Sequence, residues 1–314
     1  MQFVYFMFNF SLPECQFWFL AFAALPVRAV ARYAVAALPA SRNRGWRGHQ
    51  RDAALTVSDR PVPGAVALVT GSSRRVGQAL AFRLADQGFA LALHSSARSS
   101  AEATATAAAI MARGGQASVF VADLADAQAV AMLMPQVAER MGPVHVLVNN
   151  ASLFAADAAG QADIPVFDAH MAVNLRAPVQ LAAALAAQLP DDAQGAIINI
   201  VDQRVWRLNP QYFSYTLSKA ALWTATQTMA QAFAPRIRVN AIGPGPVLAN
   251  GAQKAESFAK EVKAVLLQHA VALEAIADAM AYLLQARSVT GQMIAVDGGQ
   301  HLAWQTPDVL AGGG

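Results

Sequence analysis

The hydrophobic positions of this 314-residue chain fall into two alternating patterns from residue 62 onward. Short runs are almost continuously apolar, as expected of strands that are buried on both faces. Between them lie longer segments in which apolar residues recur every three or four positions, as in amphipathic helices. The predicted strands are 65–69, 90–93, 118–121, 144–148, 196–200, 238–241 and 293–296. The predicted helices are 77–87, 99–112, 127–141, 166–189, 214–233 and 273–284.

The order of these elements predicts the fold class. Strand and helix alternate throughout residues 65–296, which is typical of α/β proteins whose parallel sheet is covered by helices on both faces. Several predicted helices end at glycine, as in ADQG and ARGG, which suits a left-handed C-terminal cap. The pattern therefore predicts a single doubly wound α/β domain over residues 61–304.

Residues 1–60 differ from the rest of the chain. They begin with an aromatic and apolar run and continue into an arginine-rich segment. The run lacks the basic start of a signal peptide, and Pro13 and Glu14 interrupt it before it is long enough to span a membrane. We expect an N-terminal extension that is poorly ordered or precedes the true start, a cytoplasmic location, and a short tail at 305–314. The alternative, a membrane-anchored form, depends wholly on residues 1–30.

The charge distribution argues against a polyanionic partner. The whole chain carries a net charge of +3, but residues 1–60 hold seven arginines and three acidic residues, a net of +4, which leaves −1 for the remainder. A nearly neutral body gives no electrostatic reason to bind nucleic acid. The single cysteine, Cys15, excludes an internal disulfide, and no His/Cys cluster has zinc-site spacing, so no metal is expected.

Two glycines follow the first predicted strand. Gly71 permits a tight turn, and Gly77 lets the first helical turn pack closely against the sheet. The N-terminus of that helix then offers free N–H groups and the positive end of its dipole to a pyrophosphate. The segment indicates a dinucleotide site, although an ordinary tight turn would carry the same two glycines.

The segment LALHSSARSS, at the end of the second strand, indicates which dinucleotide is bound. In a doubly wound sheet the adenosine ribose lies here, and a carboxylate would bind the 2′-hydroxyl of NAD. This segment has no carboxylate and offers donors to a 2′-phosphate, so NADPH or NADP is favoured as the cofactor. The donors are His94, Ser95, Arg98 and Ser99. Alternatively, Arg98 solvates the start of the next helix.

Polar residues at the ends of the next two strands are further candidates. Asp123 follows the third strand, where it could accept a hydrogen bond from the adenine amino group or cap the next helix. Asn149 and Asn150 end the fourth strand and are expected to face the crevice in which such sheets bind ligands, unless they form a polar turn.

Tyr215 and Lys219 form the candidate catalytic pair. In YTLSK they stand four residues apart and share one face of a predicted helix. Tyrosine, with a pKa of about 10, is a poor acid–base group at neutral pH, but the Lys219 ammonium and an oxidised nicotinamide would lower that pKa. Asn174 lies within another predicted helix, where asparagine is unfavourable. It is either exposed or marks a backbone irregularity that holds a water near the lysine.

These motifs, in this order, resemble those of the short-chain dehydrogenase/reductase family. The resemblance covers residues 62–304 and rests on TGSSRRVG, ADL, NNAS, VNLRAP, YTLSK, RIRVNAIGPGPV and VDGG. It implies a single-domain Rossmann fold with a seven-stranded parallel sheet, and assembly into a homo-oligomer, a dimer or a tetramer. It also implies that other residues of these motifs contact the ligands: Val76, Leu124, Ala151, Pro244 and Gly245 the cofactor, and Ser152 the substrate.

Two departures from the family pattern resemble one subgroup, the pteridine reductases and the similar dihydromonapterin reductases. Arg75 stands where the first turn of the family usually has glycine, and Asp202 replaces the catalytic serine. In NNASLF, Phe154 stands where the subgroup stacks a pterin ring on the nicotinamide. The resemblance implies that Arg75 contacts the pyrophosphate and the polar edge of the pterin. Phe154 would offer the pterin an apolar face.

The aspartate suits reduction of a C=N bond, in which nitrogen gains a proton as carbon gains hydride. Asp202 could share and relay that proton with Tyr215, and the pair would titrate as a unit. The alternatives are a structural salt bridge of Asp202 with Arg204 or Arg207, and plain core packing of Phe154.

We therefore predict an NADPH-dependent reductase of a small molecule, a dihydropterin or a related C=N or C=O substrate. One rival is a general carbonyl or alcohol oxidoreductase of the same family. A second rival is an NADP-binding regulatory protein without turnover, against which the intact Tyr215 and Lys219 argue. The remaining histidines follow no partner pattern and are interpreted as structural: His49, His145, His170, His269 and His301.

Overall fold

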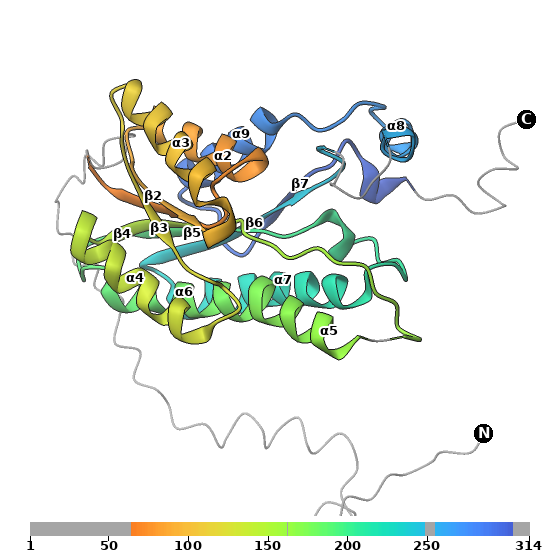
Figure 1. The fold of residues 1–314 in the computed structure, drawn as a ribbon, viewed down its shortest axis with the longest axis horizontal. Coiled ribbons are helices and arrows are strands. Elements are labelled where there is room, and N and C mark those ends of the chain that lie inside the picture. Colours follow the sequence, from red (N-terminus) through yellow and green to blue (C-terminus); the bar gives the residue numbers. More distant parts are fainter. Residues whose placement is uncertain (1–63, 162, 249–254, 304–314) are drawn as a thin grey trace, which may run out of the picture. The chain divides into compact units, whose positions relative to one another are not determined.

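The computed structural model describes residues 64–161, 163–248 and 255–303, so the predicted N-terminal extension and C-terminal tail lie outside the described residues. Seven parallel strands form one sheet in the order β3–β2–β1–β4–β5–β6–β7 (Figure 1). They are β1 (Val66–Val69), β2 (Ala90–Ser95), β3 (Gln116–Val121), β4 (Val144–Asn149), β5 (Gly195–Ile200), β6 (Ile237–Pro244) and β7 (Met293–Val296). Each predicted strand is present, and the predicted doubly wound fold is confirmed.

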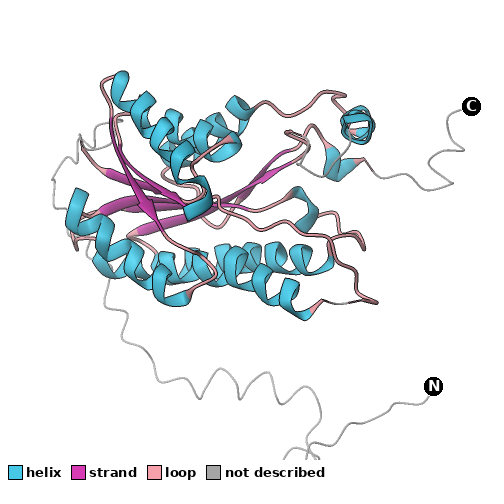
Figure 2. Cartoon of the chain, viewed as in Figure 1, coloured by secondary structure: helices cyan, strands magenta, loops and turns pink. Residues whose placement is uncertain are grey.

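Helices cover both faces of this sheet (Figures 1 and 2). The α4, α5, α6 and α7 helices lie on one face, and α2, α3 and α9 lie on the other. Their bounds are α2 (Arg75–Asp86), α3 (Ser100–Ala112), α4 (Ala127–Met141), α5 (Ile164–Met171), α6 (Ala177–Gln188), α7 (Phe213–Phe233), α8 (Ala255–Ala264) and α9 (Leu273–Gln285). Short 3₁₀ turns occupy η1 (Ala97–Ser99), η3 (Gln203–Val205) and η4 (Gln300–Leu302).

The strands read as continuous apolar runs because both of their faces are buried. In β1, Leu68 packs into a core shared with Leu181 of α6. Its neighbour Val69 packs into a second core, on the other face, shared with Leu80 of α2 and Met280 of α9. All of these side chains are essentially inaccessible to water, so their burial stabilises each layer by roughly 1.5–3 kcal/mol per large side chain.

The helix predicted over 166–189 is interrupted. α5 passes into a π-helical segment, η2 (Ala172–Arg176), which continues directly into α6. Asn174 lies in this segment and is fully buried, so the alternative that it is exposed is wrong. A π-helical segment of this kind is a known feature of functional sites.

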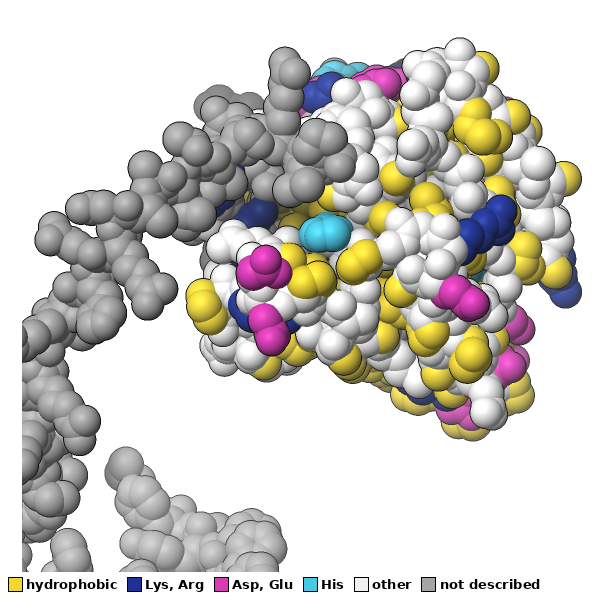
Figure 3. Space-filling view, turned by 90° about the vertical axis from the view of Figure 1, so that its left-hand side faces the viewer, with side chains coloured by type: hydrophobic (Ala, Val, Ile, Leu, Met, Phe, Trp, Pro, Cys, Tyr) yellow, Lys and Arg dark blue, Asp and Glu magenta, His cyan; other side chains and the backbone are white. Residues whose placement is uncertain are grey.

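Figure 3 shows the side of the domain that lies at the left in Figure 1, where acidic and basic side chains of the described residues are interspersed with apolar ones. The loops that follow the strands lie at the other end. Among the helices in the described part of the chain, none combines the length and the apolar character that a membrane span requires.

Candidate active site

The carboxyl ends of the strands open into a cleft of about 1970 Å³. The sheet order reverses between the adjacent strands β1 and β4, and in doubly wound sheets ligands bind outside this reversal. Most of the predicted site residues line the cleft. They are Gly71, Arg75, Val76, Gly77, His94, Arg98, Ser99, Asp123, Leu124, Asn150, Ala151, Ser152, Phe154, Asp202, Tyr215, Lys219, Pro244 and Gly245.

The glycine turn between β1 and α2 is as tight as the two glycines predict. Gly71 has a φ of +64°, a left-handed conformation that glycine adopts without cost. A Cβ on Gly77 would collide with the Gly71 carbonyl oxygen and would lie 2.6 Å from the Asn150 amide nitrogen. The bare backbone therefore leaves a cradle at the helix N-terminus, which fits the pyrophosphate of a dinucleotide.

Gly77→Ala is expected to destabilise the domain by about 1–3 kcal/mol, because the added methyl group overpacks the turn. The displaced N–H groups should also weaken NADPH binding about tenfold or more. Thermal unfolding and titration of NADPH fluorescence would measure both effects. Gly160→Ala is the matched control, since a Cβ there meets no atom within 4 Å. Equal behaviour of the two variants would contradict the cradle.

The structure corrects the prediction that the side chains of Ser95 and Asn149 face the cleft. Both end their strands, both are almost fully buried, and neither lines the cleft. The Asn149 amide donates to Asn199 Oδ1 on β5 at 2.8 Å, beneath the cleft floor. Asn150 does line the cleft, and its amide donates to the Gly71 carbonyl at 3.0 Å. Successive residues point to opposite sides of a strand, so only one asparagine of the pair can face the ligand.

His94 has a different role from the predicted phosphate donor. Its Nδ1 accepts from the Gly71 N–H at 3.2 Å, so the proton lies on Nε2, which donates to the Ala122 carbonyl at 3.1 Å. Burial lowers the pKa of His94 to about 4, against weaker raising effects from Ala122 and the Asp123 charge. The ring is neutral at pH 7 and both of its nitrogens are engaged. It therefore braces the glycine turn.

His94 should make the domain sensitive to acid. A histidine whose folded pKa lies below its unfolded value of 6.5 contributes stability that is lost as the pH falls from 6.5 through about 4. The full loss is about 3 kcal/mol. His94→Asn keeps an acceptor near the Nδ1 position but does not titrate, so its free energy of unfolding should vary less over this range. Urea unfolding between pH 4 and 7 tests this, with His145→Asn, on the opposite end of the sheet, as control.

The remaining predicted donors to a 2′-phosphate lie together after β2. Arg98 and Ser99 line the cleft, and Ser99 Oγ lies 3.2 Å from Ser96 Oγ. Ser96, and Arg74 of the glycine turn, were not predicted, although both line this part of the cleft. Neither stands at a position that pattern or spacing singles out.

The alternative role of Asp123, capping of the next helix, is wrong. Its Oδ1 accepts from the Ala125 N–H at 2.9 Å, while Asp126 caps α4 by accepting from the Gln128 N–H. Asp123 is exposed and lines the cleft, so its carboxylate remains accessible to a ligand.

Tyr215, Asp202 and Lys219 come together at the floor of the cleft. The Tyr215 hydroxyl donates to Asp202 Oδ2 at 2.9 Å, and the Lys219 ammonium donates to the Ile200 carbonyl at 2.8 Å. Asp202 follows β5, whereas the other two lie on α7, one helical turn apart. Asp202 thus joins the predicted pair of Tyr215 and Lys219, as the sequence predicts.

The electrostatics of this group favour a protonated tyrosine. Burial raises the pKa of Tyr215 well above its usual range, and the charge of Asp202 raises it further. Burial also raises the pKa of Asp202, against the backbone N–H of Arg204, and lowers that of Lys219 to about 8. The expected lowering of the Tyr215 pKa by Lys219 is not found: the charge that lowers it is that of Arg204, and the effects of burial and Asp202 are larger. Tyr215 rests as a proton donor, the state that a reduction requires.

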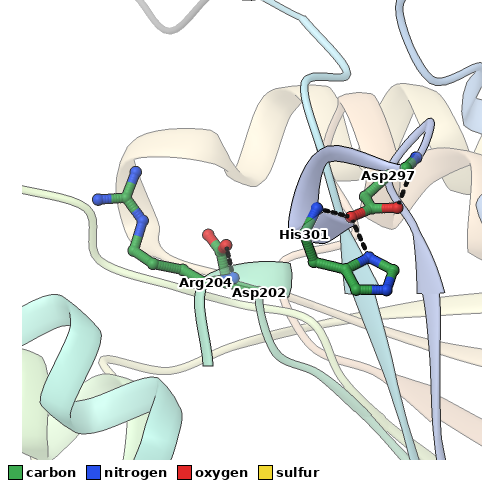
Figure 4. A network of polar contacts seen from close by, with 5 residues as sticks. Asp202, Arg204, Asp297 and His301 are labelled. Carbon is green, nitrogen blue, oxygen red and sulfur yellow. Dashed lines mark hydrogen bonds and ion pairs between the residues drawn. The ribbon is translucent and has the colours of Figure 1, made fainter. Parts of the chain in front are cut away.

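The Asp202 carboxylate is held by backbone as well as by Tyr215. Its Oδ1 accepts from the Arg204 N–H at 2.8 Å, and Figure 4 shows the Arg204 guanidinium extending away from it. That guanidinium donates instead to Asn209 Oδ1 at 3.0 Å. In the same view Asp297 and His301 lie beyond the carboxylate, where Asp297 Oδ2 is 2.7 Å from His301 Nδ1. This second pair fixes the turn after β7 beside the site.

Asn174 does not line the cleft but holds one of its walls. Its Oδ1 accepts from the Leu153 N–H at 2.8 Å, and its Nδ2 donates to the Leu153 carbonyl and to Ser218 Oγ, each at 3.0 Å. The amide is therefore fully used by the protein. The predicted water near Lys219 would have to be bound by the backbone of the π-helical segment.

Phe154 stands in the cleft wall and is 39% exposed, so core packing is wrong as an alternative. It stacks on Tyr212 with ring centroids 4.2 Å apart and meets Tyr215 edge to face at 4.7 Å. Tyr212 was not predicted as a site residue, although it stands only three residues before Tyr215. It precedes α7 with a left-handed φ of 55°.

Residues 65–260 match the short chain dehydrogenase family. The chain belongs to this family. The predicted family and the predicted oxidoreductase class are thus confirmed, and the glycine cradle, Tyr215 and Lys219 stand in a fold whose enzymes use a nicotinamide cofactor. Within the described residues, no group of three or more His, Cys, Asp or Glu side chains is placed to hold a metal ion.

Three relatives show the range of activities near this chain. The crystal structure of FolM alternative dihydrofolate reductase 1 from Brucella canis, complexed with NADP, is 51% identical, covers 79% of this chain and 98% of that chain, and has a TM-score of 0.76. The chloroplastic NADPH-dependent aldehyde reductase 2 of Arabidopsis thaliana is 35% identical over 62% of this chain and 77% of its own length. A 3-oxoacyl-(acyl-carrier-protein) reductase of Staphylococcus epidermidis is 30% identical over 75% and 98%.

Proposed function

We propose that this protein is an NADPH-dependent reductase of dihydropterins, a class that includes dihydrofolate. The hydrogen bond from Tyr215 to the Asp202 carboxylate carries the proposal, because it places an acid–base pair where carbonyl reductases of the family use a serine. The 51% identity to FolM alternative dihydrofolate reductase 1 supports the same substrate class.

The chemistry of the pair suits a C=N bond. When bound, NADPH supplies a hydride, so the protein must deliver a proton to the neighbouring nitrogen. Tyr215 holds that proton at its hydroxyl, and Asp202, 2.9 Å away, can take up the next proton and pass it on. Because the two share a proton, they titrate as a unit. A serine could donate a hydrogen bond but could not store a proton in this way.

The walls of the cleft fit a flat heterocycle. Phe154 is partly exposed in the cleft wall, and Tyr212 stacks on one face of its ring. Arg75 reaches from the glycine turn across the cleft, where its Nη2 donates to the Leu248 carbonyl at 2.8 Å. Its other guanidinium N–H groups can bind a phosphate or the polar edge of a pterin.

The segment after β2 supports NADPH over NADH. Arg98→Ala should lower kcat/KM with NADPH by about 10–100-fold, the value of a hydrogen bond to a charged group, and leave kcat/KM with NADH unchanged. Initial rates with both cofactors measure the ratio. Arg113→Ala is the matched control, since that guanidinium lies over the Phe82 ring at 4.5 Å and does not line the cleft. An unchanged ratio in Arg98→Ala would exclude it from the cofactor site.

A substrate panel tests the proposal directly. NADPH consumption would be followed with dihydrobiopterin, dihydromonapterin and dihydrofolate, beside aldehydes, ketones and quinones. The second candidate, a general carbonyl reductase, is favoured by the identities of 30–35% to aldehyde and oxoacyl reductases. Turnover of carbonyl compounds without any dihydropterin would establish that candidate and overturn the pterin assignment.

A further inference from the structure

His170 occupies an unusual position for a structural histidine. It lies on α5, its side chain is fully buried, and both of its ring nitrogens are hydrogen-bonded. Nε2 accepts from the Ala155 N–H at 3.1 Å, and Nδ1 lies 2.7 Å from Ser214 Oγ. The ring also meets that of Tyr215 edge to face, with centroids 6.0 Å apart. One side chain thus joins the wall that carries Phe154 to the helix that carries Tyr215.

The protonation state of His170 follows from these contacts. Because Nε2 accepts a hydrogen bond, the proton of the neutral ring lies on Nδ1, which donates to Ser214 Oγ. Burial lowers the pKa of His170, against the opposing effect of the Asp157 charge. The ring is therefore a neutral connector of fixed tautomer.

His170 repeats the arrangement of Asn174 one helical turn earlier. Asn174 grips Leu153, the residue before Phe154, and reaches Ser218, the residue before Lys219. His170 grips the residue after Phe154 and reaches the residue before Tyr215. The two side chains therefore form equivalent sets of hydrogen bonds, which join the backbone on either side of Phe154 to α7. On α7, each set ends at the residue before a catalytic side chain.

We propose that His170 is a positioning residue, which sets Phe154 through the Ala155 N–H and Tyr215 through Ser214. The two ends of the ring then serve different steps. The Nε2 end holds the aromatic face against which a flat substrate stacks, and the Nδ1 end holds the first turn of α7. The first of these roles rests on the proposed function, since it assumes a flat heterocyclic substrate. The second applies to any substrate.

Two conservative variants separate the two ends. Glutamine can place its amide oxygen near the Nε2 position, so His170→Gln keeps the bond from Ala155 and loses the bond to Ser214. Asparagine can place its amide nitrogen near the Nδ1 position, so His170→Asn keeps the bond to Ser214 and loses the bond from Ala155. Ser214→Ala removes the same contact as His170→Gln without changing the histidine. His145→Gln is the control, because His145 lies near the start of β4, at the end of the strand opposite to the cleft.

The measurement is kcat and KM with dihydrobiopterin and with an aldehyde, in variants whose thermal unfolding shows a folded domain. His170→Gln and Ser214→Ala should lower kcat about tenfold for both substrates with little change in KM. His170→Asn should raise KM about tenfold for the pterin and leave kcat and the aldehyde KM nearly unchanged.

Equal changes in kcat and KM across the variants, or no change in either, would overturn the positioning role and leave His170 as core packing. If only His170→Asn fails to fold, agreement between Ser214→Ala and His170→Gln still decides the Tyr215 arm. Absence of pterin turnover in the unaltered protein would sink the proposed function, and the kcat arm would then be decided with the aldehyde alone.

Discussion

Tyr215→Phe is expected to lower kcat by about 10²–10⁴-fold for every substrate, the contribution usually made by a positioned proton donor. The hydroxyl donates to Asp202 at 2.9 Å and rests protonated, because burial and the aspartate both raise its pKa. Phenylalanine keeps the edge contact with Phe154 and the packing of α7, so affinity for NADPH and thermal stability should change little. Steady-state kinetics, NADPH titration and thermal unfolding measure the three quantities.

The best control for this variant is Tyr212→Phe. Tyr212 lies on the same face of the cleft and stacks on Phe154, but it is not the donor to Asp202. Loss of its hydroxyl should change kcat by less than about threefold, since this hydroxyl is not bonded to the reacting group. If Tyr215→Phe kept a tenth or more of the original kcat, proton delivery would have to come from elsewhere, and the assignment of the pair would fail.

The strands and most helices of this protein could be predicted because burial on both faces leaves a plain signal. Burial on both faces makes every position of a run such as 65–69 apolar, which identifies the strand. For the same reason the run does not show which residue faces which side of the sheet. Ser95 and Asn149 illustrate this limit. Each stands at the end of such a run, and no alternation marks the face on which its side chain lies.

Site residues were predictable where they stand at a fixed spacing from one another in the sequence. Tyr215, Lys219 and Asp202 stand at such spacings, and the structure brings them together. The roles of His94 and His170 were not predictable, because each ring accepts a hydrogen bond from a backbone N–H that lies 15 or more residues away in the sequence. No side chain pattern records such a partner. The π-helical segment is hidden for a related reason, since one widened turn leaves the apolar repeat of the helix almost unchanged.

The helix α8 (Ala255–Ala264) is not among the predicted helices. None of its residues is fully buried, and its short apolar face consists of Phe258 and Val262, which are only partly buried. Residues 244–248 and Gln300 also line the cleft. Of these, Pro244 and Gly245 were predicted because they belong to a motif, whereas Leu248 and Gln300 were not. Sequence thus indicates the cofactor end of the cleft better than the substrate end.

Replacement of Asp202 should divide the substrates of the protein into two groups. Asp202→Asn keeps the size of the side chain and one acceptor oxygen, which can serve either the Tyr215 hydroxyl or the Arg204 N–H, but it can neither ionise nor store a proton. Its kcat with a dihydropterin should fall by about 10²-fold, the lower range for general acid–base catalysis. Asp202→Ser should lose pterin turnover similarly and keep, or improve, turnover of ketones. Equal losses on both substrate classes would argue against a proton relay specific to C=N reduction.

The stability of the same variants separates a catalytic role for Asp202 from a structural one. Burial raises the folded pKa of Asp202 above its usual value, so the folded protein binds this proton more tightly than the unfolded chain does. The carboxylate therefore costs stability once the pH rises through the folded pKa, and it destabilises the domain at neutral pH. A structural ion pair would do the opposite. We expect Asp202→Asn to unfold at a higher temperature than the unaltered protein at pH 7 while it loses activity, a trade typical of active-site charges. A lower unfolding temperature at pH 7 would instead identify Asp202 as a residue that holds the turn after β5 through the Arg204 N–H.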